Sequence, residues 1–525
     1  PLKSPRKIAV IGPTANPAVI NDRVFSVNGN VYGGGGSSRV HPWYIINDLK
    51  GIDNEFKNAK IYYAEGISSQ FKRHLFRNSE FRTQQGKRGL TAKYYALKSD
   101  TTQTISANLL KEQAKAAGRK EESTQIIFSP KNAGNCIVNR IDRQVDFEWW
   151  GYPDNNRTFG SDYKIEWEGY VDIHKSDSIR FFVDAQGGYQ LFIDGKLIVD
   201  ASPSQSFHVS SNAIYSKKGE SKHIKLRFWN QRSLPAEIRM GYCYDSDIDF
   251  SEAKRLASKS DVAVVCVGLD GSIELEGRDR PFDLPYGQDL LINEISKVNP
   301  NTIVVVHAGG GINMTKWIDH VSAVLHAFYP GQEGGNALAR ILSGQINPSA
   351  KLPFTLEKKW EDSPAAGNYD ETRKEKKVYY NEGIFTGYRG YEKKGISPLF
   401  PFGFGLSYSS FKYDNLSIKV IDETNAVVEI KFEISNIGDV NGAEIAQVYV
   451  TDMVSKEERP LKELKGFEKI WLKSGETKSV TIRLTKEAFQ YYNEKSKKWV
   501  FEKGDFLIKI GASSQDIRLE QKIKL

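Results

Sequence analysis

The hydrophobic pattern contains three short runs of apolar residues, 8–12, 262–267 and 302–306, which are rich in valine and isoleucine. Continuous runs of this length are typical of parallel strands that are covered on both faces. Between the second and third runs, residues 288–298 place their leucines and isoleucines on one helical face, and Asn299-Pro300 ends that helix. Strand, helix and strand in this order predict a βαβ unit, and therefore an α/β domain with a parallel sheet.

The segments that follow repeat this pattern. Residues 323–327 are predicted to form a further strand, and residues 335–342 a helix that ends before a turn rich in glycine and proline. Residues 314–320 are also predicted to be helical. This part of the α/β domain therefore extends to about residue 408.

Residues 88–246, called the inserted module below, follow a different pattern, in which apolar and polar residues alternate. Within it Asp194-Gly195 separates two apolar runs, which indicates a β-hairpin. Because the α/β pattern resumes only after this segment, we expect a β domain inserted into a surface loop. The α/β domain is then assembled from residues 1–87 and 247–408.

Residues 411–525, called the C-terminal sandwich below, show the cleanest alternation of apolar and polar positions, as at 428–434 and 480–484. Such alternation predicts half-buried antiparallel strands. Turns rich in glycine, asparagine and aspartate separate the strands, so we expect a small β-sandwich. The fold class expected for the whole chain is α/β plus all-β.

Composition narrows the functional classes. With 525 residues, the chain is long enough for several hydrophobic cores. The net charge of +8 is small for this length and the basic residues are scattered, so nucleic-acid binding is not expected. The three cysteines form no CxxC pair and the eight histidines show no metal-binding spacing, so neither a disulfide framework nor a cofactor or metal is expected. No apolar stretch reaches the roughly 20 residues of a membrane span.

The loop after the second apolar run, residues 268–281, is called the charged loop below. It carries six charged residues: Asp270, Glu274, Glu276, Arg278, Asp279 and Arg280. In open α/β sheets ligands bind beyond the carboxyl ends of the strands, which favours a carboxylic acid presented to a cleft. The other interpretation is a solvated, ion-paired surface loop, the commoner fate of charged runs. Spacing alone leaves both interpretations open.

Residues 276–280, Glu-Gly-Arg-Asp-Arg, followed by Asp-Leu-Pro at 283–285, resemble the acid/base loop of glycoside hydrolase family 3. Five further segments resemble the second domain of that family, in the same order: 7–13, 33–40, 329–335, 344–353 and 400–408. The resemblance covers the whole chain. It implies an (α/β)6-type sandwich domain, a protective-antigen-type inserted module and a fibronectin type III-like C-terminal sandwich.

The resemblance implies retaining hydrolysis by two carboxylates, a nucleophile and a general acid/base. Glu276 matches the acid/base position, and Glu274 is the second candidate. In this family the nucleophilic aspartate and most sugar contacts lie on a preceding (β/α)8 barrel, which these residues do not include. Retaining enzymes need their carboxylates about 5–5.5 Å apart, so this chain is expected to require a barrel domain, from the same precursor or a separate chain.

Sugar contacts are predicted for Trp149 and Trp150, whose rings could stack on a pyranose, and for Ser26 at the rim of the cleft. Packing of at least one tryptophan in a hydrophobic core is the alternative. The glycine loop, residues 33–40, lacks the spacing of a phosphate-binding motif and is predicted to form a tight turn. Arg278 and Arg280 are expected to turn away from Glu276 and to pin the charged loop through ion pairs, because a nearby cation would discharge a general acid.

The expected function is a β-glucosidase-like hydrolase that releases a terminal sugar from a β-glucoside or oligosaccharide. The alternatives are a non-catalytic carbohydrate-binding protein and a β-xylosidase-like hydrolase. A periplasmic or secreted location is favoured slightly over a cytoplasmic one. The choice between sugars depends on residues that the resemblance places mostly in the barrel domain.

Overall fold

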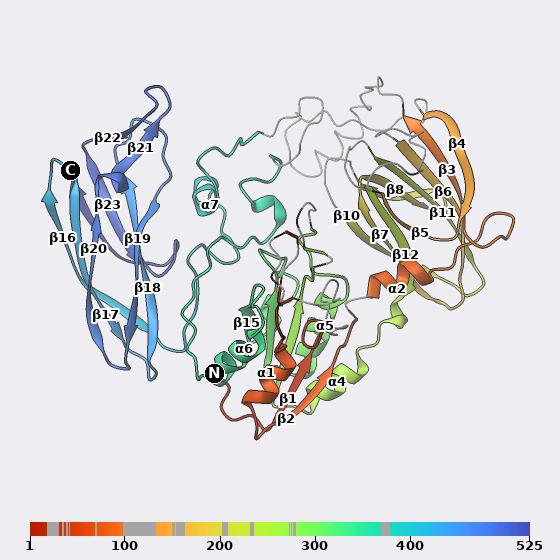
Figure 1. Cartoon of the computed structure of the whole chain (residues 1–525), viewed down its shortest axis with the longest axis horizontal. Helices are drawn as coiled ribbons and strands as arrows, with labels where there is room; N and C mark the ends of the chain where they lie inside the picture. The colour runs from red at the N-terminus through yellow and green to blue at the C-terminus, as the bar shows by residue number, and fades with distance from the viewer. Residues whose placement is uncertain are drawn as a thin grey trace.

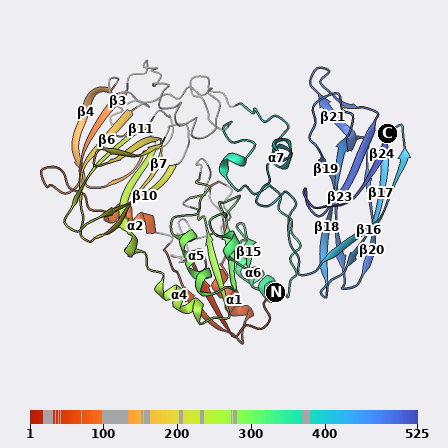
Figure 2. The same cartoon turned by 180° about the vertical axis from the view of Figure 1, so that it is seen from behind.

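A computed structural model describes residues 1–17, 31–33, 36–37, 40, 42–68, 71–97, 133–149, 153, 163–201, 208–230, 236–271, 273–274, 276, 280–368 and 379–525. Figures 1 and 2 show an α/β unit at the centre, with the inserted module on one side and the C-terminal sandwich on the other. The predicted combination of α/β and all-β units is confirmed.

The central unit is built on a five-stranded parallel sheet with the order β15-β14-β13-β1-β2. Its strands are β1 (Lys7–Ile11), β2 (Lys60–Ala64), β13 (Val262–Gly268), β14 (Thr302–His307) and β15 (Ala323–His326). β1 and β13 pair directly, although the inserted module separates them in the sequence. The carboxyl ends of β1, β13 and β14 therefore meet at one edge of the sheet.

Helices cover both faces of this sheet, which is why β13 and β14 are buried along their whole length. They are α1 (Asp48–Glu55), α4 (Ser251–Ser258), α5 (Gln288–Val298) and α6 (Gly334–Ser343). Leu256 and Leu291, from α4 and α5, join one core with Val265, whereas Ile52 and Leu338, from α1 and α6, join the other core. The helices predicted at 288–298 and 335–342 are confirmed.

The helix predicted at 314–320 is wrong, because only the short 3-10 helix Ile318–His320 forms there. The amide of Ile318 donates to the Met314 carbonyl at 2.9 Å, but this helical turn does not continue, because the amide of Ser322 already donates to the Thr302 carbonyl (2.8 Å) in the approach to β15. Further 3-10 helices are Asp245–Asp247, Trp360–Asp362 and Lys486–Phe489.

The inserted module consists of two antiparallel sheets around one aromatic core that includes Trp167, Phe181 and Phe228. One sheet, in the order β10-β7-β12-β5, contains His208–Ser216, Asp177–Gln186, Ala236–Tyr244 and Val145–Trp149. The other, β4-β3-β6-β11-β8-β9, contains Ala133–Asp142, Leu90–Leu97, Tyr163–Asp172, Ser221–Asn230, Gly188–Ile193 and Lys196–Ala201. β8 and β9 form the hairpin predicted at Asp194-Gly195, where both residues have positive φ.

An aromatic contact joins the inserted module to the α/β domain. Tyr286, in the segment between the charged loop and α5, lies 4.7 Å from Phe182 of β7, measured between ring centroids. The Tyr286 ring also stacks on Phe71 at 6.2 Å, in helix α2 (Phe71–Asn78). The module is therefore packed directly against the polypeptide that leads out of the charged loop.

The C-terminal sandwich has one sheet of β16 (Phe411–Asp422), β17 (Val427–Asn436) and β20 (Thr477–Leu484). Its second sheet has β19 (Glu463–Leu472), β18 (Gly442–Asp452), β23 (Asp505–Gly511) and β24 (Ile517–Lys524). A hairpin of β21 (Gln490–Asn493) and β22 (Lys498–Phe501) is added to these sheets. The two sheets enclose a single apolar core.

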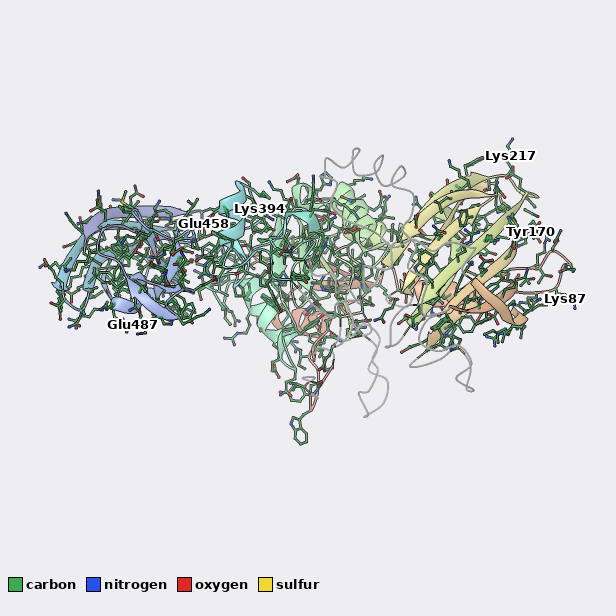
Figure 3. All side chains as sticks on the ribbon, turned by 90° about the horizontal axis from the view of Figure 1, so that it is seen from above. Lys87, Tyr170, Lys217, Lys394, Glu458 and Glu487 are labelled. Carbon is green, nitrogen blue, oxygen red and sulfur yellow. The ribbon has the colours of Figure 1, made fainter. Side chains whose placement is uncertain are left out.

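Helix α7 (Tyr388–Lys394) packs against this sandwich, at the junction marked by Lys394 and Glu458 in Figure 3. The ammonium group of Lys393 lies 2.7 Å from the Glu458 carboxylate, and the Tyr388 hydroxyl accepts a hydrogen bond of 2.9 Å from the backbone of Leu464. The junction is thus fixed by polar contacts as well as by packing.

Asp289, in the first turn of α5, makes folding sensitive to pH. Burial raises its pKa to about 6, with Lys316 opposing the shift and Asp283 adding to it. The folded-state pKa lies above the ordinary 3.8, so the folded protein favours the protonated form of Asp289. Its contribution to the free energy of unfolding is complete below pH 4 and is lost as the pH rises through 6.

Asp289→Asn is therefore expected to raise the free energy of unfolding at pH 7.5 by about 1–2 kcal/mol, and to give no gain at pH 4. Urea denaturation at both pH values measures this difference. Asp319→Asn, at an exposed position, is the control. A gain for Asp289→Asn that is the same at both pH values would contradict the assignment.

Candidate active site

Three loops meet at the carboxyl edge of the parallel sheet, where ligands bind in this type of fold. The charged loop follows β13, the segment containing Gly309 and Gly311 follows β14, and the glycine loop comes after β1. Glu274 and Glu276 both lie here, but their surroundings differ.

Glu274 is held on all sides. Its carboxylate accepts hydrogen bonds from the backbone amide of Gly309 (2.8 Å), from Arg280 Nε (2.7 Å) and from the Tyr329 hydroxyl. Its side chain is only 20% exposed. Burial alone would raise the pKa of Glu274, but the Arg280 charge and these hydrogen bonds outweigh it and lower the pKa. Glu274 is therefore an anion that anchors the loop.

Arg280 provides the other half of this anchor. Besides its ion pair with Glu274, it donates from Nη2 to the Gly311 carbonyl at 2.8 Å and from Nη1 to the Pro281 carbonyl at 3.2 Å. It pins the charged loop through an ion pair, as the sequence predicted. Arg278 and Asp279 lie outside the described residues.

Glu276 is exposed and lies against the glycine loop. Its Oε2 atom accepts hydrogen bonds from the backbone amide of Ser37 at 2.6 Å and from the Ser37 hydroxyl. Gly36 adopts φ +79°, and a Cβ atom at this position would lie 2.5 Å from the Cβ of Glu276. Only glycine fits both the conformation and the close approach.

A buried polar cluster lies beneath these loops and was not anticipated from the sequence. His307 Nε2, at the end of β14, lies 2.8 Å from the Asp48 carboxylate of α1, and neither side chain is exposed. The Tyr32 hydroxyl donates to the same carboxylate at 3.1 Å. Burial, with the Asp48 charge, raises the pKa of the Cys266 thiol and of Tyr32, so both stay neutral.

This cluster fixes the bases of all three loops. Tyr32 directly precedes the glycine loop, and Asp48 begins α1. The carbonyl of His307 accepts a hydrogen bond of 2.8 Å from the amide of Leu269, at the start of the charged loop. A partial signal was present in the sequence, namely a histidine that ends an apolar run.

Of the three predicted sugar-binding residues, the structure describes Trp149. Trp149 ends β5 and is half-buried, with its ring stacked on Phe147 at 5.0 Å and close to Tyr163 at 6.0 Å. Its position matches the alternative of core packing in the inserted module. Trp150 and Ser26 lie outside the described residues.

Within the described ranges, no group of three or more histidine, cysteine, aspartate or glutamate side chains could hold a metal ion. Across the same part of the chain, every helix is too short or too polar to cross a membrane. The arrangement thus offers acid–base groups at the edge of an α/β sheet, one carboxylate fixed as an anion and one accessible from solvent.

The profile of the glycosyl hydrolase family 3 C-terminal domain matches residues 1–408, and that of a fibronectin type III-like domain matches residues 444–514. The chain therefore belongs to glycosyl hydrolase family 3. A putative β-glucosidase from Schizosaccharomyces pombe is 32% identical over 548 residues, covering 100% of this chain and 60% of that protein. Thermostable β-glucosidase B from Acetivibrio thermocellus is 45% identical over 291 residues, covering 54% of this chain and 38% of that protein.

A solved structure of a β-glucosidase is similar to this chain over its whole length. The β-glucosidase from Kluyveromyces marxianus in complex with glucose aligns with a TM-score of 0.62 at 28% identity, over 100% of this chain and 59% of its own. This chain spans about 60% or less of the length of these three proteins.

Proposed function

We propose that this chain carries the general acid/base of a retaining β-glucosidase, and that Glu276 is that residue. The observation that carries the proposal is the contrast between the two glutamates of the charged loop. Glu274 has a lowered pKa and is occupied by Arg280 and the Gly309 amide. Glu276 is exposed at the carboxyl edge of the sheet, where a substrate can reach it.

In the first step of the proposed mechanism, a nucleophilic carboxylate attacks the anomeric carbon while Glu276 gives its proton to the departing glycosidic oxygen. The aglycone leaves with that proton, and a glycosyl-enzyme ester remains. In the second step the Glu276 carboxylate takes a proton from water, whose oxygen attacks the anomeric carbon and releases the sugar and the nucleophile. Glu276 is then protonated for the next turnover.

We place the nucleophile on a (β/α)8 barrel domain, supplied by the same precursor or by a separate chain. Two facts support this placement: the relatives are longer than this chain, and retaining hydrolysis needs a second carboxylate about 5–5.5 Å from the first. Glu274 does not fit that role, because Arg280 and Tyr329 enclose it. The substrate proposed is a β-glucoside, since the Kluyveromyces marxianus enzyme was solved with glucose.

For the architecture, we propose that the α/β domain is the (α/β)6-type sandwich of the family and that the inserted module is of the protective-antigen type. The helices on both faces of the parallel sheet support the first assignment. The two antiparallel sheets around one core support the second. The contact between Phe182 and Tyr286 sets the module beside the charged loop, so we propose that it shapes the leaving-group side of the site.

Deletion of residues 88–246 is therefore expected to change the ratio of kcat/KM between a bulky and a small aglycone by up to about tenfold. The preference between glucosides and xylosides is expected to stay the same. Phe182→Ala, which loosens the contact with Tyr286, should shift the ratio in the same direction but by less. An unchanged ratio in the deletion variant would assign the module a purely structural role.

Hydrolysis of an aryl β-glucoside tests the proposed function. The chain is assayed alone and then mixed with a separately produced barrel domain of the family, with Glu276→Ala as the control. Activity in the mixture that the substitution removes supports the proposal. If neither preparation hydrolyses the substrate but sugar binding is measurable, the result favours a carbohydrate-binding protein. A preference for aryl β-xylosides favours a xylosidase-like enzyme.

A further inference from the structure

The contact between Glu276 and the glycine loop involves one of the two carboxyl oxygens of Glu276. Two donors from one residue, the amide and the hydroxyl of Ser37, converge on a single oxygen, Oε2. The other carboxyl oxygen, Oε1, has no hydrogen bond to any residue that the structure describes. The two oxygens of Glu276 are therefore not equivalent.

We infer that Ser37 is a positioning residue for the general acid, which selects Oε1 of Glu276 as the oxygen that carries the transferred proton. The inference rests on the proposed role of Glu276. A proton on Oε2 would either face the Ser37 N–H group or force the Ser37 hydroxyl to turn from donor to acceptor, whereas a proton on Oε1 leaves both hydrogen bonds in place. The proton is therefore held on Oε1, and the Ser37 contact sets the direction in which it is presented.

The exposure of the Glu276 side chain explains why the contact with Ser37 is needed. Glu276 is a long, exposed side chain that would otherwise sample many rotamers. Hydrogen bonds to a charged carboxylate are short and directional, and two of them fix the plane of the carboxyl group. A displacement of about 1 Å in a catalytic group costs on the order of 100-fold in rate, so this restraint bears directly on proton transfer.

The glycine loop is itself held in place, so it can transmit this restraint. The amide of Val40 donates to the Gly33 carbonyl at 3.3 Å, which closes the loop on itself. Tyr32, the residue directly before the glycine loop, donates a hydrogen bond from its hydroxyl to the buried Asp48 carboxylate. Gly36 permits the close approach, because any Cβ there would meet Glu276. Ser37 is thus supported from the buried cluster beneath the site.

The dependence of kcat/KM on the leaving group shows whether Ser37 positions the general acid or has only a structural role. A departing 2,4-dinitrophenolate needs no proton, whereas a departing alkoxide does. In the preparation that hydrolyses aryl β-glucosides, Ser37→Ala is expected to lower kcat/KM roughly 10- to 100-fold for an alkyl β-glucoside and by less than about threefold for the 2,4-dinitrophenyl glucoside. Ser37→Thr, which keeps both donors, should recover most of the loss. Ser496→Ala, in an exposed turn of the C-terminal sandwich, is the matched control.

A second readout needs no activity. Labelling with carbonyl-13C glycine and 15N serine selects the amides of serines that follow glycine, of which the sequence has three, Ser37, Ser161 and Ser272. One of these amide signals should disappear in Ser37→Ala, and the same signal should move upfield in Glu276→Ala, measured on the full chain. A Ser37 signal that Glu276→Ala leaves unmoved would overturn the contact.

The kinetic outcomes distinguish this inference from the proposed function. An equal loss for both glucosides in Ser37→Ala, while Glu276→Ala still discriminates between them, would overturn the positioning role alone. Glu276→Ala without any leaving-group dependence would overturn the proposed function, and the positioning role with it.

Discussion

Glu276→Ala is expected to lower kcat/KM for an alkyl β-glucoside by about 100- to 10,000-fold, because general acid catalysis contributes a factor of this size. For the 2,4-dinitrophenyl glucoside, formation of the glycosyl-enzyme should proceed almost normally, since that leaving group departs as an anion. Its hydrolysis should then slow at the second step, where the proposed mechanism assigns Glu276 the role of base. Steady-state and pre-steady-state rates on the two substrates measure the contrast.

Glu274→Ala is the matched control two residues away. It removes the partner of Arg280, whose side chain is only 17% exposed, and takes acceptors from the Gly309 amide and the Tyr329 hydroxyl. We expect it to lower the free energy of unfolding and to reduce the rates on both glucosides by similar factors. A leaving-group dependence that appears in Glu274→Ala and not in Glu276→Ala would reverse the assignment of the two glutamates.

Asp48→Ala is expected to lower the free energy of unfolding by about 3–5 kcal/mol, the largest effect on stability that we predict. Asp48 and His307 are fully buried, and the substitution would leave His307 Nε2 and the Tyr32 hydroxyl without their shared acceptor. The bases of the charged loop and the glycine loop would lose their common anchor. Urea denaturation, followed by tryptophan fluorescence, measures the loss.

Asp53→Ala, on the same helix, is the control for Asp48→Ala. Asp53 is exposed and forms a surface ion pair of 3.4 Å with Lys50, so its removal should change stability little. Comparable losses for the two variants would show that the cost comes from helix α1 and not from the buried cluster.

Much of the fold follows from local patterns in the sequence. The apolar runs at 262–267 and 302–306 become β13 and β14, because strands covered on both faces leave no polar positions. The hairpin at Asp194-Gly195 follows from the need for positive φ at both turn residues. The helix predicted at 314–320 did not form, because the chain turns into strand β15 at Ala323 only a few residues later.

The site depends on contacts between residues that are far apart in the chain, so its geometry could not be predicted in the same way. Ser37 and Glu276 are 239 positions apart, and Asp48 and His307 are 259 apart. Nothing in the local spacing of the charged loop could show that Arg280 and Tyr329 would enclose Glu274. The family resemblance supplied Glu276 as the candidate, and the surroundings of the two glutamates give a physical reason for the choice.

Rescue of Glu276→Ala by azide tests the central claim most directly. With the barrel domain present and the 2,4-dinitrophenyl β-glucoside as substrate, the preparation that carries the variant should accumulate a glycosyl-enzyme that azide attacks without base assistance. The product is expected to be β-glucosyl azide, formed with net retention and identified by the coupling constant of its anomeric proton. Formation of α-glucosyl azide would make Glu276 the nucleophile, and a wild-type rate without azide would remove it from the mechanism; either result would contradict the account.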